Sequence, residues 1–162
     1  MSDVVTARVH LRDAEGSEDM ATTRALFEEY AASIGVDLCF QGFAEELASL
    51  PGAYARPGGC LLLAERGEAL GCVALRPLTA GIGEVKRLYV RPAARGEGVG
   101  AMLARAVIER AGICGYRELK LDTLQTMTTA HALYAALGFR PCAPYYDNPL
   151  PGVTYMSLAL SA

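Results

Sequence analysis

One segment constrains the fold of this chain more than any other: an apolar strand that continues through a short turn into a glycine-rich loop. The strand Leu88–Val90 is followed by Arg-Pro-Ala-Ala and then by Arg95–Gly100, which reads Arg-Gly-Glu-Gly-Val-Gly. Glycine tolerates the backbone angles that bring consecutive N–H groups together at the start of a helix. Those groups, the helix dipole and the Arg95 guanidinium all attract an anion. The segment therefore predicts a strand, a phosphate-binding loop and a helix, in that order.

The loop alone leaves alternatives open, because several nucleotide-binding folds place glycines between a strand and a helix. A P-loop ends in Gly-Lys-Ser or Gly-Lys-Thr, whereas Ala101 and Met102 follow Gly100 here. A dinucleotide-binding fold needs an acidic residue at the end of the next strand, and Asp122 lies within that strand rather than clearly at its end. A flexible turn that leads into a helix is the third interpretation.

The hydrophobic pattern predicts alternating helices and strands in a single domain. Apolar residues make up 52% of the 162 residues, enough for one sizeable core, and no linker divides the chain. One helix is expected to begin after Ser17 or Asp19, either of which can cap it, and to end at Gly35. Three more helices are expected at 43–50, from the glycine-rich loop to Gly112, and at 128–137. The predicted strands are 6–11, 60–65, 71–76, 84–90, 118–123, 139–143 and 153–160. Pro77 is expected to end the strand 71–76.

Two motifs of the C-terminal half lie in a characteristic order: the strand 88–90 with its Arg-x-x-Gly-x-Gly loop, and the helix end Leu133-Tyr134-x-x-Leu137-Gly138-Phe139. A strand, Glu118–Thr123, separates them. On these motifs the chain resembles the GNAT family of acetyl-CoA-dependent N-acetyltransferases over about residues 60–140. The resemblance implies one α/β (α+β) GNAT domain over residues 1–162. Its central sheet would be mixed, mostly antiparallel and of about six or seven strands, flanked by about four helices.

The resemblance also implies acetyl-CoA as cosubstrate and assigns residues to it. In GNAT enzymes the strand before the loop diverges from the next one, pantetheine enters the gap, and the pyrophosphate lies on the loop amides. Carried over, Leu88 and Val90 offer backbone groups to pantetheine, and a backbone N–H near Val90 polarises the acetyl carbonyl. Tyr89 lies between them, with its side chain on the other face unless a bulge changes the register. The pyrophosphate would be held by Arg95, Gly96, Glu97, Gly98, Val99 and Gly100.

Two residues match the catalytic groups of GNAT enzymes. Glu84, six residues before Val90, corresponds to the glutamate that serves as general base in some members. The alternative for Glu84 is an ion pair with Lys86 or Arg87. Tyr134 corresponds to the tyrosine that protonates the departing CoA thiolate, and its alternative is an apolar contact in the helix.

One position departs from the family pattern. Many members bind the cofactor through an asparagine seven residues before the tyrosine, where this chain has Met127. If the contact survives, the backbone or the hydroxyl of Thr126 or Thr128 must supply it.

The region that would bind the amine carries no specific motif. Residues 1–50 hold ten acidic residues and three arginines, a net charge of −7, which leaves +4 for the rest of the chain. A cationic acceptor would suit the acidic part and a phosphate-rich cofactor the basic part, although solvated helix faces explain the charges equally well. Six aromatic or acidic residues are candidates for the wall of an acceptor pocket: Phe27, Tyr30, Phe40, Tyr145, Tyr146 and Asp147. The alternative is that the phenylalanines belong to the core and that residues 148–152 form a rigid turn without a ligand.

Composition narrows the remaining classes of function. The five cysteines form no Cys-x-x-Cys pair, so we expect reduced thiols and no metal site. The chain is acidic and has no basic stripe, so we do not expect it to bind nucleic acid. We see neither a signal peptide nor an 18-residue apolar run, and therefore expect a cytoplasmic protein with no membrane segment. The predicted function is acetyl transfer from acetyl-CoA to a primary amine, by direct attack in a ternary complex. The alternative is an inactive acyl-CoA-binding regulator or sensor, and a homodimer is left open.

Overall fold

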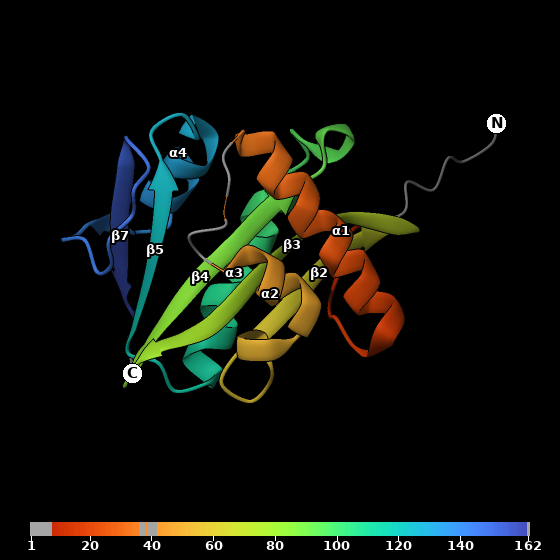
Figure 1. The fold of residues 1–162 in the computed structure, drawn as a ribbon, viewed down its shortest axis with the longest axis horizontal. Coiled ribbons are helices and arrows are strands. Elements are labelled where there is room, and N and C mark those ends of the chain that lie inside the picture. The colour runs from red at the N-terminus through yellow and green to blue at the C-terminus, as the bar shows by residue number, and fades with distance from the viewer. Residues whose placement is uncertain (1–7, 36–37, 39–41, 162) are drawn as a thin grey trace.

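The computed structural model describes residues 8–35, 38 and 42–161, which build one seven-stranded sheet (Figure 1). Across the sheet the order is β1-β2-β3-β4-β5-β7-β6, and every neighbouring pair is antiparallel except the parallel pair β4 and β5. The expected mixed, mostly antiparallel sheet is thus confirmed. The strands are β1 (His10–Asp13), β2 (Cys60–Arg66), β3 (Glu68–Thr79), β4 (Ile82–Val90), β5 (Glu118–Leu124), β6 (Arg140–Pro141) and β7 (Val153–Ala159).

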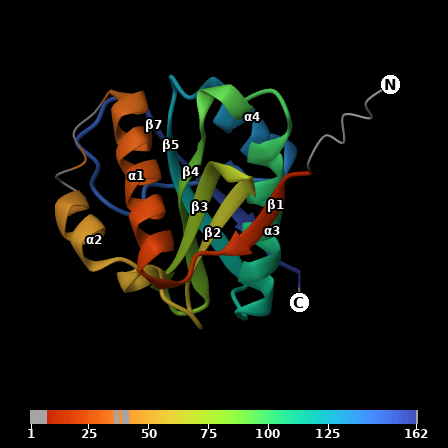
Figure 2. The ribbon, with the colours of Figure 1, turned by 90° about the vertical axis from the view of Figure 1, so that its right-hand side faces the viewer.

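Helices cover both faces of this sheet (Figure 2). On one face lie α1 (Gly16–Ile34) and α2 (Phe43–Ser49); on the other lie α3 (Val99–Ile113) and α4 (Thr128–Ala136). The short 3-10 helices η2 (Gly52–Tyr54) and η3 (Pro92–Ala94) lie in connections.

Each face of the sheet has its own apolar core. Leu103, Val107 and Ala111, spaced four residues apart on α3, are all buried, because this spacing forms one stripe along a helix. They pack with buried residues of β2 to β5 and with Tyr134 of α4. On the opposite face Leu26 and Phe27 of α1 are fully buried in a second cluster. The two cores hold β4 in place from both sides, whereas β5 contributes Leu119 and Leu121 to the first core.

The parallel strands β4 and β5 are paired only near their start. Residues 82–84 of β4 are in register with 118–120 of β5, and no pairing continues beyond Glu84 and Lys120. The two strands diverge from there, as the GNAT resemblance implies. The gap leads toward the glycine-rich loop, because β4 ends at Val90 just before it.

A β-bulge lies in the diverging part of β4. Tyr89 is opposite Cys72 and Lys86 is opposite Ala74. Between these two pairs β4 therefore contains one residue more than β3. Arg87, in the bulge, has a φ of 61°, the left-handed region that a non-glycine residue rarely adopts. The bulge directs two consecutive side chains, Lys86 and Arg87, to the α1 side of the sheet, since an extra residue interrupts the alternation of a strand.

Several predicted boundaries were wrong. β1 is His10–Asp13 rather than 6–11, and residues 1–7 lie outside the described part. β3 continues through Pro77, which is paired with Gly83 next to a register shift where the regular ladder is already interrupted. β6 has two residues instead of five.

The start of α1 also differs from the prediction. The helix begins at Gly16, and its N-cap, Glu15, makes no side-chain cap. Ser17 and Asp19 therefore lie inside the helix. The Asp19 carboxylate instead accepts hydrogen bonds from the Glu15 N–H and from Arg12.

Candidate active site

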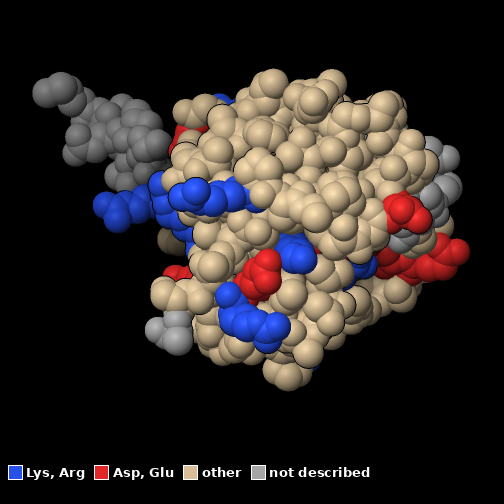
Figure 3. Space-filling model, turned by 90° about the vertical axis from the view of Figure 1, so that its left-hand side faces the viewer, with Lys and Arg blue, Asp and Glu red and all other residues tan. Residues whose placement is uncertain are grey.

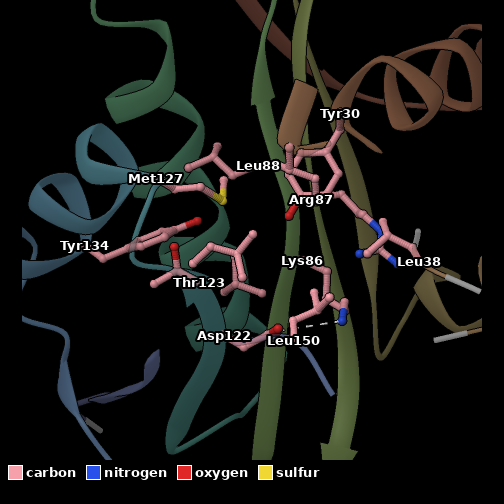
Figure 4. A pocket seen from close by; sticks show the side chains of 13 residues that line it. Tyr30, Leu38, Lys86, Arg87, Leu88, Asp122, Thr123, Met127, Tyr134 and Leu150 are labelled. Carbon is pink, nitrogen blue, oxygen red and sulfur yellow. Dashed lines mark ion pairs between the residues drawn. The ribbon is translucent and has the colours of Figure 1, made fainter. Parts of the chain in front are cut away.

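A narrow cavity of about 30 Å³ lies where β4 and β5 diverge (Figure 4). Residues 85–88 of β4 and 122–124 of β5 form its two long walls. The other lining residues come from α1, from the start and body of α4, and from two connections; they are Tyr30, Ile34, Leu38, Met127, Tyr134 and Leu150. Because the strands are unpaired here, the cavity reaches both faces of the sheet.

The two ends of the cavity differ in chemistry. On the α4 side it is lined by Met127, Tyr134 and Thr123, which are uncharged. On the α1 side Lys86 and Arg87 extend toward Tyr30 and Leu38 (Figure 4). Asp122 lies beside Lys86 at the lower edge of the same view.

Tyr134 lies at the uncharged end, as expected for the proposed acid. Its side chain is buried, packs edge-on against Phe139 at 5.5 Å between ring centroids, and directs its hydroxyl into the cavity. Burial raises the pKa of Tyr134 well above its usual value, because the phenolate would lose its hydration. The hydroxyl therefore keeps its proton at neutral pH.

Thr123 adds a group that the sequence did not point to. Its residue is 5% exposed and lines the cavity, and its Oγ1 has no hydrogen-bond partner within the described part of the chain. A buried hydroxyl without a partner is unfavourable by about 1–3 kcal/mol. Such a group favours a ligand that completes its hydrogen bond.

Glu84 is buried just behind the cavity and is not among the lining residues. Arg76 Nε donates to its Oε1 at 2.7 Å and the Tyr145 hydroxyl donates to its Oε2 at 2.6 Å. The Lys86 ammonium lies 4.0 Å from the same Oε2. Burial alone would raise the pKa of Glu84, but Lys86, Arg76 and Tyr145 together lower it below its usual value. Of the two partners considered from the sequence, Lys86 is near Glu84 and Arg87 pairs elsewhere.

Lys86 is the ammonium group of the charged end. Its side chain is 4% exposed, and its Nζ lies 3.9 Å from Asp122 Oδ1 as well as 4.0 Å from Glu84 Oε2. Burial lowers the pKa of Lys86, and the two carboxylates counteract that effect. Asp122 itself accepts hydrogen bonds at Oδ2 from the Tyr146 hydroxyl, at 2.7 Å, and from Asn148, at 3.4 Å.

Arg87 is held by α1 and α2. Its Nε and Nη2 donate to the two carboxylate oxygens of Glu46, at 3.0 and 3.1 Å. Its guanidinium also lies over the rings of Tyr30 and Phe43. This bidentate pair compensates the buried charge of Arg87.

The glycine-rich loop has the geometry of an anion site. Gly98 is the N-cap of α3 with a φ of 79°, Gly96 has a φ of 83°, and both are exposed. Two neighbouring side chains have partners within the chain. Arg95 Nε donates to the Val90 carbonyl, and the Glu97 carboxylate pairs with Arg66. The exposed backbone N–H groups at the start of the 15-residue helix α3 can therefore meet a phosphate.

The three β4 residues assigned to the cofactor alternate as expected. Leu88 and Val90 pack toward the core that contains α3 and Tyr134, whereas Tyr89 joins the core of α1. The bulge lies before Leu88, so it leaves the alternation of Leu88, Tyr89 and Val90 with one another intact. Val99 is buried in the α3 core, so only its backbone can contribute to the loop.

The other candidates for an acceptor pocket are distributed differently. Tyr30 lines the cavity, but Phe27 is fully buried against Tyr54. Tyr145 and Tyr146 form a second layer through their hydrogen bonds to Glu84 and Asp122, Asp147 is exposed, and Phe40 lies outside the described residues.

The acidic residues of the N-terminal part are mostly paired. Glu29 binds Arg91, Glu46 binds Arg87 and Asp13 binds Arg110. The face on the β5 and β7 side is largely uncharged; acidic and basic side chains lie together near its centre, while further acidic side chains lie toward the right of the view and basic ones toward the left (Figure 3). These pairs neutralise only part of the net charge of the N-terminal residues, and none of the three acids lines the cavity. The acidic mouth for a cationic acceptor stays a prediction.

Comparison with known proteins identifies the family. A sequence model of the acetyltransferase (GNAT) family matches residues 23–139. The chain belongs to the GNAT family. It is an acetyl-CoA-dependent N-acetyltransferase by that membership, and its fold is the GNAT fold.

Individual GNAT relatives support the assignment over nearly the whole chain. An uncharacterized N-acetyltransferase of Schizosaccharomyces pombe is 43% identical over 147 residues, which are 89% of this chain and 90% of that protein. The N-acetylaspartate synthetase of Danio rerio is 34% identical over 67% of this chain and 40% of its own length. An acetyltransferase of Salmonella typhimurium, solved with acetyl-CoA, superposes with a TM-score of 0.70 over 94% of each chain; at 22% identity it shows the fold alone.

In the described residues, no cluster of His, Cys, Asp and Glu side chains could hold a metal ion. None of the helices in those residues combines the length and the apolar character of a membrane span.

Proposed function

We propose that this GNAT enzyme transfers the acetyl group of acetyl-CoA to a primary amine, by direct attack in a ternary complex. The observation that supports this most is the cavity between β4 and β5, because it connects an uncharged end under Tyr134 with a charged end at Lys86 and Asp122. A thioester can approach from one face of the sheet and an amine from the other. Neither has to leave before the second binds, which suits direct attack.

The chain offers a consistent set of groups for acetyl-CoA. We assign the pyrophosphate to the N–H groups of residues 95–100 and the Arg95 side chain, and pantetheine to the backbone of Leu88, Tyr89 and Val90, which β5 leaves unpaired. The fit rests on the N-cap geometry of Gly98 and on the open space around it, since a Cβ built there meets no atom within 4 Å.

Replacing Gly98 by aspartate should lower the affinity for acetyl-CoA by more than about tenfold, because a carboxylate would occupy the N–H groups that the pyrophosphate needs. Gly115→Asp is the matched control, because Gly115 also has a positive φ and no atom within 4 Å of a built Cβ, but lies after α3, at its other end. Calorimetry with acetyl-CoA measures both variants. Equal affinities for the wild type and a folded Gly98→Asp protein would contradict the assignment.

The proposed chemistry needs one polarised carbonyl and three proton transfers. A backbone N–H near Val90 polarises the acetyl carbonyl while the neutral amine forms the new C–N bond and the C–S bond breaks. Tyr134 gives its proton to the departing thiolate, and the proton that the nitrogen loses as the amide forms returns to the Tyr134 oxygen through water. Glu84 takes the proton of the acceptor ammonium, and because Glu84 lies behind the cavity wall, we propose that a water molecule carries that proton.

We propose that Thr123 supplies the hydrogen bond that Met127 cannot make at the thioester end. Thr123→Val keeps the shape and removes an unpaired buried hydroxyl, so the melting temperature should stay the same or rise. The same change should lower kcat/KM for acetyl-CoA by about 2- to 10-fold, and Thr123→Ser should restore it. Steady-state kinetics with both variants measure the effect. Unchanged kinetics in Thr123→Val would leave the hydroxyl without this role.

Release of the CoA thiol in the presence of an amine panel tests the proposed function. Initial rates with both substrates varied should give intersecting lines, as expected for a ternary complex. Parallel lines would instead indicate a covalent acetyl-enzyme. Tight binding of acetyl-CoA without thiol release for any amine would favour the alternative, an inactive acyl-CoA sensor.

A further inference from the structure

We propose that the acceptor is a small amine that also carries a carboxylate, as a free amino acid does, and that Lys86 binds this carboxylate while Asp122 binds the amine. The proposal deepens the proposed function and rests on it. It assigns the charged end of the cavity to the acceptor.

The position of Lys86 is the first argument. The chain has only two lysines against thirteen arginines, and this one is buried in β4 between Glu84 and Arg87. The bulge at Arg87 directs both cations to the α1 side, where the cavity opens away from Tyr134. Keeping an ammonium group 4% exposed is unfavourable unless anions surround it, and a lysine in a ligand cavity serves as a compact point charge for an anion.

The distances around Lys86 are the second argument. Its Nζ lies 3.9 Å from Asp122 Oδ1 and 4.0 Å from Glu84 Oε2, which is ion-pair distance but beyond hydrogen-bond distance. Both carboxylates accept hydrogen bonds from other residues, Glu84 from Arg76 and Tyr145, and Asp122 from Tyr146 and Asn148. These hydrogen bonds fix the two carboxylates beside Lys86, so the cavity presents a cation and an anion at defined positions.

Asp122 provides the complementary charge. Its Oδ2 accepts the bonds from Tyr146 and Asn148, whereas its Oδ1 is the atom nearest Lys86, and its side chain is 16% exposed. A cation and an anion that line one cavity 3.9 Å apart match a zwitterion whose amine and carboxylate are close neighbours.

The other charged groups near the cavity are already committed. Arg87 is held by the two oxygens of Glu46. Of the acidic residues of α1 and β1, Glu29 pairs with Arg91 and Asp13 pairs with Arg110, and neither acid lines the cavity. The charge of the acceptor is therefore recognised by Lys86 and Asp122 rather than by the acidic N-terminal part.

Paired substrates test the proposal on the wild-type enzyme. Each of a panel of L-amino acids is compared with its own carboxamide, which keeps the amine and the size but removes the negative charge. The α-amine of an amino acid amide has a lower pKa than that of the amino acid, so a larger fraction of the amide is unprotonated at neutral pH. This difference favours the amide, so it cannot produce the expected preference for the amino acid. We expect kcat/KM for at least one amino acid to exceed that of its amide by about tenfold or more.

Variants of Lys86 locate the effect. Lys86→Gln should remove the preference for the carboxylate by lowering the rate with the amino acid alone, and Lys86→Arg should keep much of it. Lys120→Gln is the matched control, since Lys120 is the other lysine and does not line the cavity. Calorimetry of the same amino acid and amide, with CoA bound, gives a readout that does not depend on turnover.

The outcomes separate the two proposals. Equal kcat/KM for amino acids and amides, together with amide turnover, would overturn this inference and leave the acetyltransferase function intact. Equal losses for both substrates in Lys86→Gln would assign Lys86 a structural role and also overturn it. Absence of thiol release with every amine would contradict the proposed function and this inference with it. If Lys86→Gln does not fold, the wild-type comparison and Lys86→Arg still decide.

Discussion

Replacing Glu84 by glutamine should lower kcat/KM for the amine by about 10²- to 10⁴-fold near neutral pH, because the amide cannot take the proton of an ammonium acceptor. Glutamine preserves the size of the side chain and can still accept hydrogen bonds from Arg76 and Tyr145. The measurement is a pH profile of kcat/KM for the wild type and the variant.

The pH dependence of this loss distinguishes a base from a structural residue. The folded-state pKa of Glu84 is lowered, so its charge is present at any neutral or alkaline pH, and the stability it contributes is lost only as the pH falls through that lowered value. The deficit of Glu84→Gln should therefore shrink as the pH rises toward the pKa of the acceptor amine. A deficit that stays constant with pH would indicate that Glu84 only supports the strand and Lys86.

Two matched variants complete that experiment. Asp122→Asn removes the carboxylate that lines the cavity, and it should raise KM for the amine more than it changes the pH profile. Asp13→Asn breaks the ion pair with Arg110, at 2.6 Å, and should leave kcat unchanged. If Asp122→Asn and not Glu84→Gln showed the pH-dependent loss, Asp122 would be the base.

Replacing Tyr134 by phenylalanine should lower kcat by about 10²-fold or more and change the affinity for acetyl-CoA little. The variant keeps the ring, which packs against Phe139, and removes only the hydroxyl that points into the cavity. Because burial raises the pKa of Tyr134, the wild-type hydroxyl stays protonated, and kcat should show no alkaline loss from this residue in the ordinary assay range.

Tyr116→Phe is the matched control for the tyrosine experiment. It also removes a partly buried hydroxyl, one that donates to the Gly58 carbonyl, but it does not line the cavity. Presteady-state thiol release separates the chemical step from product release in all three proteins. Wild-type turnover in Tyr134→Phe would show that the tyrosine only fills space in the core.

The fold could be predicted from the sequence because its signals are local. Glycines that need positive φ define the loop before α3, and the four-residue spacing of Leu103, Val107 and Ala111 defines the buried face of that helix. These features depend on neighbouring residues in the chain. The order of the motifs then suggested the family, and the family fixed the topology.

The charged end of the site could not be predicted in the same way. Regular alternation places Lys86 and Arg87 on opposite faces of β4, and only a bulge, which depends on the pairing with β3, directs both to one side. The partner of Glu84 was also missed, because Arg76 comes from the neighbouring strand and Tyr145 lies 61 positions away. The available signal was the presence of three charged residues, Glu84, Lys86 and Arg87, inside a strand of the sheet.

Thr123 and the N-terminal acids show the same limit. Nothing in the sequence distinguishes the buried Thr123 hydroxyl, which has no partner among the described residues, from the neighbouring threonines. The net charge of the first 50 residues suggested an acidic mouth, but long-range pairs such as Glu29 with Arg91 neutralise part of that charge away from the cavity. The composition of a chain gives the number of charged side chains, but it does not show which of them form ion pairs in the fold.

A crystal structure of the protein with CoA and a carboxylate-bearing amine tests the central claim most directly. We predict that the pyrophosphate lies on the N–H groups of residues 96–100 and that the CoA sulfur lies between Tyr134 and Thr123. We further predict that the amine reaches the sulfur from the Lys86 and Asp122 side, through the gap between β4 and β5. A sulfur outside this gap, or an amine bound on the same side of the sheet as CoA, would contradict the account.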